Sequence, residues 1–473
     1  MALLRRLVDV REGEVRALLY SSAFFFCVLW SYFLLKPVRE TMGLRGRVDD
    51  LSWLYLGTLG AMLAVTPLYT LLVKKLPRRR FIPWVYRFFI TNLVVFYLLE
   101  QVVSDAEGPR TTLGYVFFVW LSVFNMFAVA VFRSFMADIF TSEQGKRLFG
   151  FIGVGGTIGA LGGSWTSGQL ISLPFMGLGE LMLVSAVLLE LAVFCFRRIP
   201  GLVAASSEEQ HQEERYQCQA CGYSLRGLHS LDPCPECGGD LTRSYEVAPE
   251  GIRYIENEPL GLGGAFRAFT LVGRSPYMIG ICLFMLCFTV TSTLVWFTRM
   301  NFVQDFADSE TEKLWVFSNI FLITQLLTLV TQVFFTGRII KSIGVGATLS
   351  IIPIVTLTGF VALAISPILG VIIALESIRS ASNYALSRPA REVLFTVLTV
   401  EEKYKAKAFI DTFVYRGGDV IGALAFRLIT AMSVTFVGLA SIVAVISMGW
   451  TGLAILLGRR QRVMAAEARA AAG

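Results

Sequence analysis

A basic residue, a proline, an arginine and a glutamate recur in the same order at two places, and each copy adjoins or lies within a long apolar run. Residues 36–40 read K-P-V-R-E and residues 388–392 read R-P-A-R-E. Ionisable side chains are costly at membrane depth, so they usually face a bundle interior or a water-filled cavity and mark a solute pathway. The two motifs therefore predict a carrier or a channel.

The composition is that of a protein with many membrane spans. Of the 473 residues, 55% are hydrophobic, only 16% are charged, and 37 are Phe. Such a balance is typical of a polytopic membrane protein. The net charge of +7 would suit a nucleic acid or an acidic surface, but most of the excess lies in short loops and tails, where it sets membrane orientation. We therefore expect the lipid bilayer, and no nucleic acid, as a partner.

Twelve apolar runs predict twelve transmembrane helices, because a helix needs about 20 apolar residues to cross a bilayer. The expected spans are 15–36, 51–73, 81–102, 112–139, 145–171, 176–196, 276–298, 313–336, 343–365, 367–397, 404–430 and 434–457. Neighbouring runs such as 145–171 and 176–196 nearly merge, so eleven or thirteen spans are alternatives.

Charge alternates between successive loops and sets the orientation. The basic loops carry Lys74, Lys75, Arg78, Arg79, Arg80, Lys146, Arg147, Arg338, Lys341, Lys403, Lys405, Lys407, Arg459, Arg460 and Arg462. The opposite loops carry Asp105, Glu107, Asp305, Asp308, Glu310 and Glu312. The positive-inside rule therefore puts both termini and the long central loop in the cytoplasm.

The chain shows weak internal symmetry. Residues 133–141 read R-S-F-M-A-D-I-F-T and residues 388–396 read R-P-A-R-E-V-L-F-T, while I-G-A-L occurs at 158–161 and again at 421–424. Chance similarity is the alternative, but the matches fall at equivalent span ends. Two parallel six-span halves resemble the major-facilitator plan. We predict an all-α polytopic fold with an N-terminal half at 1–200, a cytoplasmic loop at 201–265 and a C-terminal half at 266–473.

Two C-x-x-C pairs in the central loop predict a zinc ribbon at 216–243. The cysteines are Cys218, Cys221, Cys234 and Cys237, with a glycine directly after each pair. Four thiolates at this spacing surround one tetrahedral zinc ion and leave no open position, which favours a structural over a catalytic metal. Docking of a cytoplasmic protein partner, regulation and loop folding are three roles between which the sequence does not choose.

In the major-facilitator plan, spans one, four, seven and ten line a central cavity, and the unusual polar residues fall on these spans. Span one carries Lys36, Arg39 and Glu40, and span four carries Asn125, Arg133 and Asp138. Span seven carries Thr289, Thr291, Ser292, Thr293 and Arg299, and span ten carries Glu376, Arg379, Asn383, Arg388, Arg391 and Glu392. Basic residues outnumber acidic ones, and arginine forks suit carboxylate or phosphate, so the cavity should favour an anion.

We predict that this set divides into a binding group and a gating group. Lys36, Arg39, Asn125, Arg379 and Asn383 are expected to contact the anion. Arg133, Arg388 and Arg391, with nearby carboxylates, are expected to form a cytoplasmic gate. The alternative is that each cation is neutralised by a neighbour as a latch: Arg39 by Glu40, Arg379 by Glu376 at i, i+3, and Arg391 by Glu392.

Span eleven adds Asp411, Arg416 and Asp419 within an apolar run. Arg416 and Asp419 are three residues apart, so we expect an ion pair between them. The alternative is a carboxylate that titrates and couples transport to protons. We group these residues with Asp138, Arg299 and Glu376 as gating or coupling candidates.

The end of span one resembles the ATP/ADP translocase group of bacteria and plastids, nucleotide transporters related to the major facilitators. The resemblance lies in L-L-K-P-V-R-E at 34–40, R-E-V-L-F-T at 391–396, K-Y-K-A-K at 403–407 and I-D at 410–411. It implies nucleotide exchange across a bacterial inner membrane, with the basic residues of span one, Lys36 above all, holding phosphate. The zinc insert is foreign to that group.

Together these features predict a secondary transporter that moves an organic anion, such as a phosphorylated metabolite or nucleotide, by alternating access. The sequence contains neither a Walker-type G-x-x-x-x-G-K-[ST] motif nor a nucleophile–base set, so we expect no enzymatic activity. Three alternatives stay open: a proton-coupled carrier of another solute, a lipid flippase, and a membrane scaffold or sensor that works through the zinc ribbon. We expect a monomer.

Overall fold

The computed structural model describes residues 14–75, 78–103, 107–140, 142–215, 272–273, 275–398, 407 and 409–470. Within these ranges every regular element is helical. The predicted zinc ribbon, with Cys218, Cys221, Cys234 and Cys237, lies outside them. The expected central loop, 201–265, begins within helix α7, which is described to Arg215, and the rest of it lies outside these ranges, so the exact domain limits stay a prediction.

The helices follow the expected order of spans. The first group comprises α2 (Val15–Gly43), α3 (Leu51–Lys75), α4 (Arg78–Val102), α5 (Glu107–Ile139), α6 (Ser142–Leu170) and α7 (Leu178–Arg215), with the short 3-10 turn η2 (Val48–Asp50) before α3. The second comprises α9 (Pro276–Phe306), α10 (Glu310–Phe334), α11 (Thr336–Ile365), α12 (Leu369–Ser382), α13 (Arg388–Leu394), α15 (Tyr415–Ala431) and α16 (Phe436–Ala470). Between them lie the π-helical segments η4 (Asn383–Ser387) and η6 (Ile410–Val414) and the 3-10 turn η5 (Phe395–Val397).

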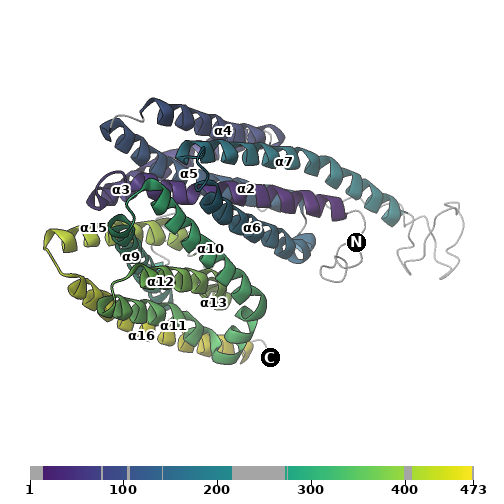
Figure 1. Ribbon diagram of the computed structural model, residues 1–473. Coiled ribbons are helices and arrows are strands. Elements are labelled where there is room, and N and C mark those ends of the chain that lie inside the picture. The colour runs from purple at the N-terminus through teal and green to yellow at the C-terminus, as the bar shows by residue number, and fades with distance from the viewer. Residues whose placement is uncertain are drawn as a thin grey trace, which may run out of the picture.

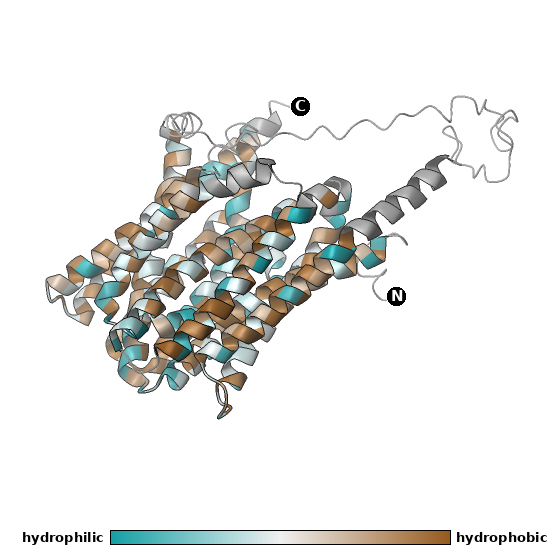
Figure 2. Ribbon diagram, turned by 90° about the horizontal axis from the view of Figure 1, so that it is seen from above, coloured by the Kyte–Doolittle hydropathy of each residue, from teal (hydrophilic) through white to brown (hydrophobic). Residues whose placement is uncertain are grey.

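Nine of the described helices contain a stretch long and apolar enough to cross a membrane, namely α2, α4, α5, α6, α7, α9, α10, α11 and α16. The described parts of the other expected spans, 51–73, 367–397 and 404–430, are largely helical, but α12 is interrupted by η4 after 14 residues. The count of twelve spans therefore stays a prediction. The protein is a multi-pass membrane protein, and Figure 2 shows hydrophobic residues along the length of the packed helices.

The two groups of helices approach one another at one end and diverge toward the other, where α2 begins and α16 ends (Figure 1). One hydrophobic core belongs to the first group, apart from Leu314 of α10, and a second core belongs to the second group. A third core bridges them, with Leu44, Leu51, Leu54 and Phe118 packed with residues of α9, α10, α12 and α15. The bridging core follows the last turn of α2, so the contact between the groups lies at the end opposite the start of α2.

Span five owes its close packing against span one to glycine. A Cβ built on Gly159 would overlap the carbonyl oxygen of Phe26 on α2, and one on Gly163 would meet the carbonyl oxygen of Trp30. Small residues let helix backbones approach closely in lipid, where dispersion and packing drive association. The glycine-rich face of α6 is therefore a packing surface, as its sequence predicts.

This packing predicts a sharp difference between two substitutions on the same helix. Gly159→Ala should destabilise the protein by about 1–3 kcal/mol, because the new methyl group meets backbone that cannot move cheaply. Gly153→Ala is the matched control, since no atom outside the neighbouring backbone of its own helix lies within 4 Å of the added Cβ. Thermal unfolding of the purified variants measures both. Equal melting temperatures for the two variants would contradict the close approach of α2 and α6.

Candidate functional site

The four spans expected to line a central cavity come together around the last turns of α2. Arg39 Nη1 donates to Ser122 Oγ on α5 at 3.2 Å. Glu40 contacts α9 through Arg299 at 3.2 Å, and Arg299 also reaches Glu376 on α12 at 3.3 Å. Helices α2, α5, α9 and α12 thus share one polar network, which was expected from the placement of charged residues on spans one, four, seven and ten.

Glu40 is the carboxylate on which this network converges. It is fully buried, and its Oε2 accepts from Trp296 Nε1 at 2.8 Å and from Arg299 Nη2 at 3.2 Å. Its Oε1 accepts from Nη2 of the neighbouring Arg39. A buried charge is tolerated only when it is paired and hydrogen-bonded. The expected Arg39–Glu40 pair is therefore present, and it extends to the second half.

Arg299 occupies the centre of the network. It is 2% exposed, it bridges Glu40 and Glu376, and its guanidinium lies 5.4 Å from the Phe317 ring centroid. The alternative in which Glu376 neutralises Arg379 is not formed between these two described residues, because the carboxylate of Glu376 pairs with Arg299. A partner on another helix has displaced the neighbour on the same helix. Contact of Arg379 with the anion stays a prediction.

Lys36 has a different environment from the arginines around it. Its ammonium group lies 4.0 Å from the ring centroid of Phe321 on α10 and 5.2 Å from that of Phe33. Among the described residues, no hydrogen bond or ion pair to the Lys36 ammonium is formed. A cation over an aromatic face is attracted by the ring quadrupole, but it keeps its hydrogen-bond donors for another partner.

Arg379 is held by neutral groups. Its Nε donates to Thr356 Oγ1 at 2.9 Å, and its Nη2 lies 3.1 Å from Thr291 Oγ1, 2.9 Å from Ser292 Oγ and 3.3 Å from the Phe288 carbonyl oxygen. Only 4% of Arg379 is exposed. These contacts fix the guanidinium in place without neutralising it, so its charge adds to the positive excess of the network.

The α-helix of span ten changes to a π-helix one turn after Arg379. The π-helical segment η4 begins at Asn383, whose buried Oδ1 lacks a hydrogen-bond partner among the described residues. π-Helical turns are frequent at functional sites. Asn125, the other amide expected to bind the anion, lies half-buried on α5. The structure places both amides on spans that share the network.

The predicted cytoplasmic gate residues lie on the diverging part of the two groups. Arg133 and Arg388 are exposed, and the guanidinium of Arg388 stacks over the ring of Tyr384 at 4.6 Å. Glu392 pairs with Lys407 at 2.8 Å, and Arg391 donates to the Met285 sulfur at 2.7 Å. The alternative in which Glu392 neutralises Arg391 stays a prediction. A gating role for these residues stays a prediction, because the groups are apart at this end.

The carboxylates of spans four and eleven are only partly described. Arg416 Nη1 lies 3.6 Å from Asp419 Oδ2, which confirms the ion pair expected from their i, i+3 spacing. The side chains of Asp138 and Asp411 lie outside the described residues. Coupling roles for all four residues stay a prediction.

An ionic latch at the closed end was missed by sequence reasoning. Arg45, just after α2, donates from Nε to Glu310 Oε1 at 2.8 Å and from Nη1 to Glu100 Oε2 at 2.8 Å. Arg110 Nη2 also donates to Glu310 Oε2 at 2.8 Å. Arg45, Glu100 and Arg110 belong to the first group of helices and Glu310 to the second, so the ion pairs of this latch that join the groups are those of Glu310.

A signal for this latch was available in the sequence. Arg45 and Arg110 are basic residues on the side of the membrane where the positive-inside rule expects acidic or short loops. Cations on that side need a local reason, and Glu310 in the facing loop supplies one. The site residues were predicted from charged residues within apolar runs. That pattern does not detect charged residues at the ends of helices, such as Arg45 and Arg110.

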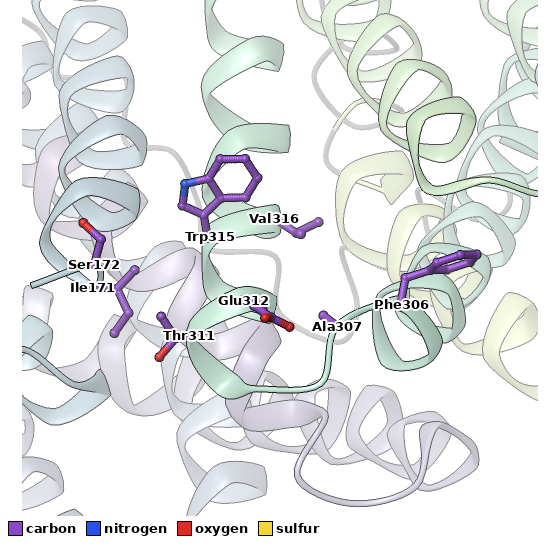
Figure 3. Close-up of a pocket in the computed structure, with 8 residues that line it drawn as sticks. All are labelled: Ile171, Ser172, Phe306, Ala307, Thr311, Glu312, Trp315 and Val316. Carbon is purple, nitrogen blue, oxygen red and sulfur yellow. The ribbon is translucent and has the colours of Figure 1, made fainter. Parts of the chain in front are cut away.

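A small hollow of about 310 Å³ lies at the first turns of α10 (Figure 3), the helix that begins at Glu310. It is lined by the end of α6, the end of α9 and the first turns of α10, including Ile171, Phe306, Trp315 and Val316. Its one carboxylate, Glu312, already accepts from the Asp308 backbone N–H at 2.9 Å and so completes the start of α10. The hollow is mostly apolar and lacks cationic groups in its lining, so it is a poor site for an anion.

The central network carries more positive than negative charge. Four cations, Lys36, Arg39, Arg299 and Arg379, face two carboxylates, Glu40 and Glu376. The Nε atoms of Arg39 and Arg299 are buried and have no hydrogen-bond acceptor among the described residues. Buried donors are nearly always satisfied in native structures, by protein, water or ligand. The arrangement can therefore accept an anion between the two halves.

Comparisons with known proteins agree with this architecture. The sequence matches the family described as the Major Facilitator Superfamily over residues 21–399. No curated protein matches the sequence. The crystal structure of a bacterial homologue of the iron transporter ferroportin in the inward-facing state is similar, with a TM-score of 0.57 and 11% identity over 95% of this chain and 98% of that chain.

Two further solved structures show weaker likeness. The nucleoside transporter NupG has a TM-score of 0.49 and 13% identity, over 96% of this chain and 99% of that one. A bacterial homologue of the human lysosomal transporter Spinster, in an inward-facing and unoccupied conformation, also has a TM-score of 0.49, with 12% identity over 97% and 96%. The likeness to the ferroportin homologue supports the fold alone.

The latch predicts that Glu310→Gln opens the closed end. Loss of this carboxylate leaves Arg45 without its contact to the second half and should favour the open state by about 1–2 kcal/mol, or roughly tenfold, given the partial exposure of the pair. Single-molecule energy transfer between dyes on unnatural amino acids at Thr112 and Phe306 measures the distance. Glu312→Gln is the matched control, because Glu312 bonds only within its own loop. An equal shift in both variants would refute the latch.

Proposed function

The chain belongs to the Major Facilitator Superfamily, and from that premise we propose that it is a secondary transporter that moves an organic anion by alternating access. The proposed substrate class is a phosphorylated metabolite. A nucleotide is the specific case that the resemblance of residues 34–40 to the ATP/ADP translocase group suggests. We also propose that it acts in a bacterial inner membrane, with the termini in the cytoplasm.

The environment of Lys36 carries this proposal. Its ammonium group is held by the rings of Phe321 and Phe33 alone, while the nearby carboxylates of Glu40 and Glu376 are occupied by arginines. An ammonium that keeps its donors in a partly dry site favours an anionic oxygen. Because Lys36 belongs to α2 and Phe321 to α10, an anion bound here would contact both halves.

The arginines supply the rest of a phosphate site. Arg299 also lies near Phe321, with its guanidinium 5.6 Å from the ring centroid, so the two cations flank one ring. Arg379 lies one turn from Glu376 on α12 and is fixed by hydroxyl groups. Arginine forks match the geometry of phosphate oxygens. A doubly charged or triply charged phosphate compound would balance the cation excess better than a monocarboxylate.

The two halves are in contact at one end and apart at the other, and this difference determines the side from which the site is accessible. Hydrogen bonds and ion pairs between the halves cluster at the end of Arg45, Glu40 and Glu310. The halves diverge at the end where α2 begins (Figure 1), which loop charge assigns to the cytoplasm. We interpret the structure as the inward-facing state of the transport cycle.

Exchange of labelled nucleotides tests the proposal. Proteoliposomes should take up ATP, ADP or phosphate faster when unlabelled nucleotide is present inside, and Lys36→Ala should lower uptake by roughly ten- to a hundredfold. Loss of one charge-assisted contact costs about 1.5–3 kcal/mol. Lys313→Ala is the matched control. This substitution removes the same charge, but Lys313 lies outside the network, where it donates to Gln304 at 3.0 Å.

Two results would count against the proposal in different ways. If folded wild-type protein takes up no phosphorylated compound, the substrate class is wrong and a broad anion screen follows. If uptake occurs but Lys36→Ala retains it in full, the substrate class stands and the position of the site is wrong.

We further propose that Cys218, Cys221, Cys234 and Cys237 hold one structural zinc ion. The support is the chemistry of four thiolates in two C-x-x-C pairs, since these residues lie outside the described ranges. Elemental analysis of purified protein should give about one zinc per chain, and Cys218→Ser with Cys234→Ser should lose it. A ribbon that only folds the loop predicts that deletion of 206–245 leaves transport intact. Zinc retained by the double variant would refute the site.

A further inference from the structure

A second cationic site lies on the outer surface of the first group of helices, away from the transport network. A cavity of about 580 Å³ between α4 and α7 is lined by Arg80, Pro83, Trp84, Arg87, Phe88 and Thr91 of α4, together with Arg197 of α7. The α4 positions follow the spacing i, i+3, i+4, i+7, i+8 and i+11, which places them on one helical face. The two helices run side by side (Figure 1).

This face points out of the bundle. Trp84 is 77% exposed and Phe88 is 61% exposed, and the apolar surface continues on α7 through the exposed side chains of Leu191 and Phe194. Helix α4 packs against α7, α5 and α3 of its own group. Large exposed apolar side chains on a membrane-spanning helix face lipid, so the cavity opens to the bilayer rather than to the transport path.

The cavity lies at the end where α2 begins and α16 ends. Helix α3 returns the chain, so α4 starts at that end, and Arg80 is in its first turn. Arg87 is seven residues further along, or about 10 Å deeper at 1.5 Å per residue. The site therefore spans the level of the headgroups and the first part of the hydrocarbon. Loop charge assigns this end to the cytoplasm.

The charges in the cavity are only partly balanced. Arg87 Nη2 donates to Glu190 Oε1 on α7 at 2.6 Å, and both side chains of this pair are about half exposed. Arg80 and Arg197 form no hydrogen bond or ion pair among the described residues. The guanidinium groups of Arg80 and Arg197 are thus available to bind an anion, and the same cavity is lined by the aromatic side chains of Trp84 and Phe88. A ligand that fits must carry negative charge at one end and apolar surface at the other.

We propose that this cavity binds the headgroup of an anionic phospholipid from the cytoplasmic leaflet. Arg80 and Arg197 contact the phosphate, and Trp84 and Phe88 pack against the glycerol region and the first acyl carbons. Basic pockets between transmembrane helices on the cytoplasmic side are suited to anionic headgroups. A free phosphate ion would leave the exposed aromatic surface uncovered. The site does not depend on which solute the central network carries.

Native mass spectrometry of the full chain in detergent tests the charge requirement. The titrant is phosphatidylglycerol, compared with phosphatidylcholine that has the same acyl chains. Each arginine near an anionic lipid is worth roughly a fivefold change in affinity, so Arg80→Gln with Arg197→Gln should weaken phosphatidylglycerol binding by about 30-fold. The matched control is Arg338→Gln with Lys341→Gln, two exposed residues of α11 that remove the same charge from the same end.

Quenching of Trp84 fluorescence tests the position of the lipid without an arginine variant. Phosphatidylglycerol with brominated acyl chains should quench wild-type protein more than Trp84→Phe, and brominated phosphatidylcholine should not show this difference. Equal lipid retention by the double variant and its control would overturn the proposal. So would displacement of phosphatidylglycerol by millimolar inorganic phosphate, because that result would indicate a site for free anions.

Discussion

The fully buried carboxylate of Glu40 needs hydrogen-bond donors, and it obtains all of them only when the two halves are in contact at the closed end. Burial of an isolated carboxylate costs several kcal/mol, and hydrogen bonds from charged donors offset this cost only when the geometry is good. Arg39 comes from its own half, while Trp296 and Arg299 come from the other. The closed end is therefore the arrangement in which Glu40 has its full set of donors. Separation of the halves would still leave Arg39 in contact, so Glu40 is never without a cation.

This asymmetry makes two states accessible to one protein. If all partners of Glu40 lay on the opposite half, opening would leave a bare buried charge at a cost of about 3–5 kcal/mol. With Arg39 on the same helix, opening exchanges the contacts to Arg299 and Trp296 for water. Under the proposed function, an anion that binds Lys36 and Arg299 competes with Glu40 and Glu376 for Arg299. Such a ligand acts on the contact between the halves because it changes the partners of that contact.

The closed end has three layers with different physical character. Ion pairs of Arg45 with Glu100 and Glu310 lie at the rim. Below them the rings of Tyr55 and Phe118 from the first half make edge-to-face and tilted contacts with Trp296 and Phe297 of the second half, and the Glu40 network follows. Partly exposed ion pairs contribute little to stability, whereas buried aromatic pairs add about 0.5–1.5 kcal/mol beyond the area they bury. The aromatic layer therefore contributes most to the stability of the contact between the halves, and the ion pairs at the rim fix how the two halves are aligned.

Sequence reasoning located most helices and the spans of the central network, because apolar runs and charges within them are local signals. It also identified Arg39–Glu40 and Arg416–Asp419, whose partners are one or three residues apart. It failed for Glu376, where the i, i+3 rule names Arg379 but Arg299 on another helix forms the pair. The rule describes an isolated helix, in which the neighbour is the only candidate partner. Inside a bundle, residues of three other helices compete, and the outcome depends on packing distances that no local pattern contains.

The environment of Arg379 shows how such a competition is decided. The hydroxyl groups of Thr291, Ser292 and Thr356, together with the Phe288 carbonyl, offer four neutral acceptors on two other helices. They can hold a guanidinium without a carboxylate, and this leaves Glu376 for Arg299. The run of hydroxyl residues on span seven was visible in the sequence as an unusual polar stretch within an apolar helix. As acceptors for a cation on a neighbouring span, these hydroxyl groups favour the contacts of Arg379 with neutral groups. They therefore also favour the Arg299–Glu376 pair over the i, i+3 pair of Arg379 and Glu376.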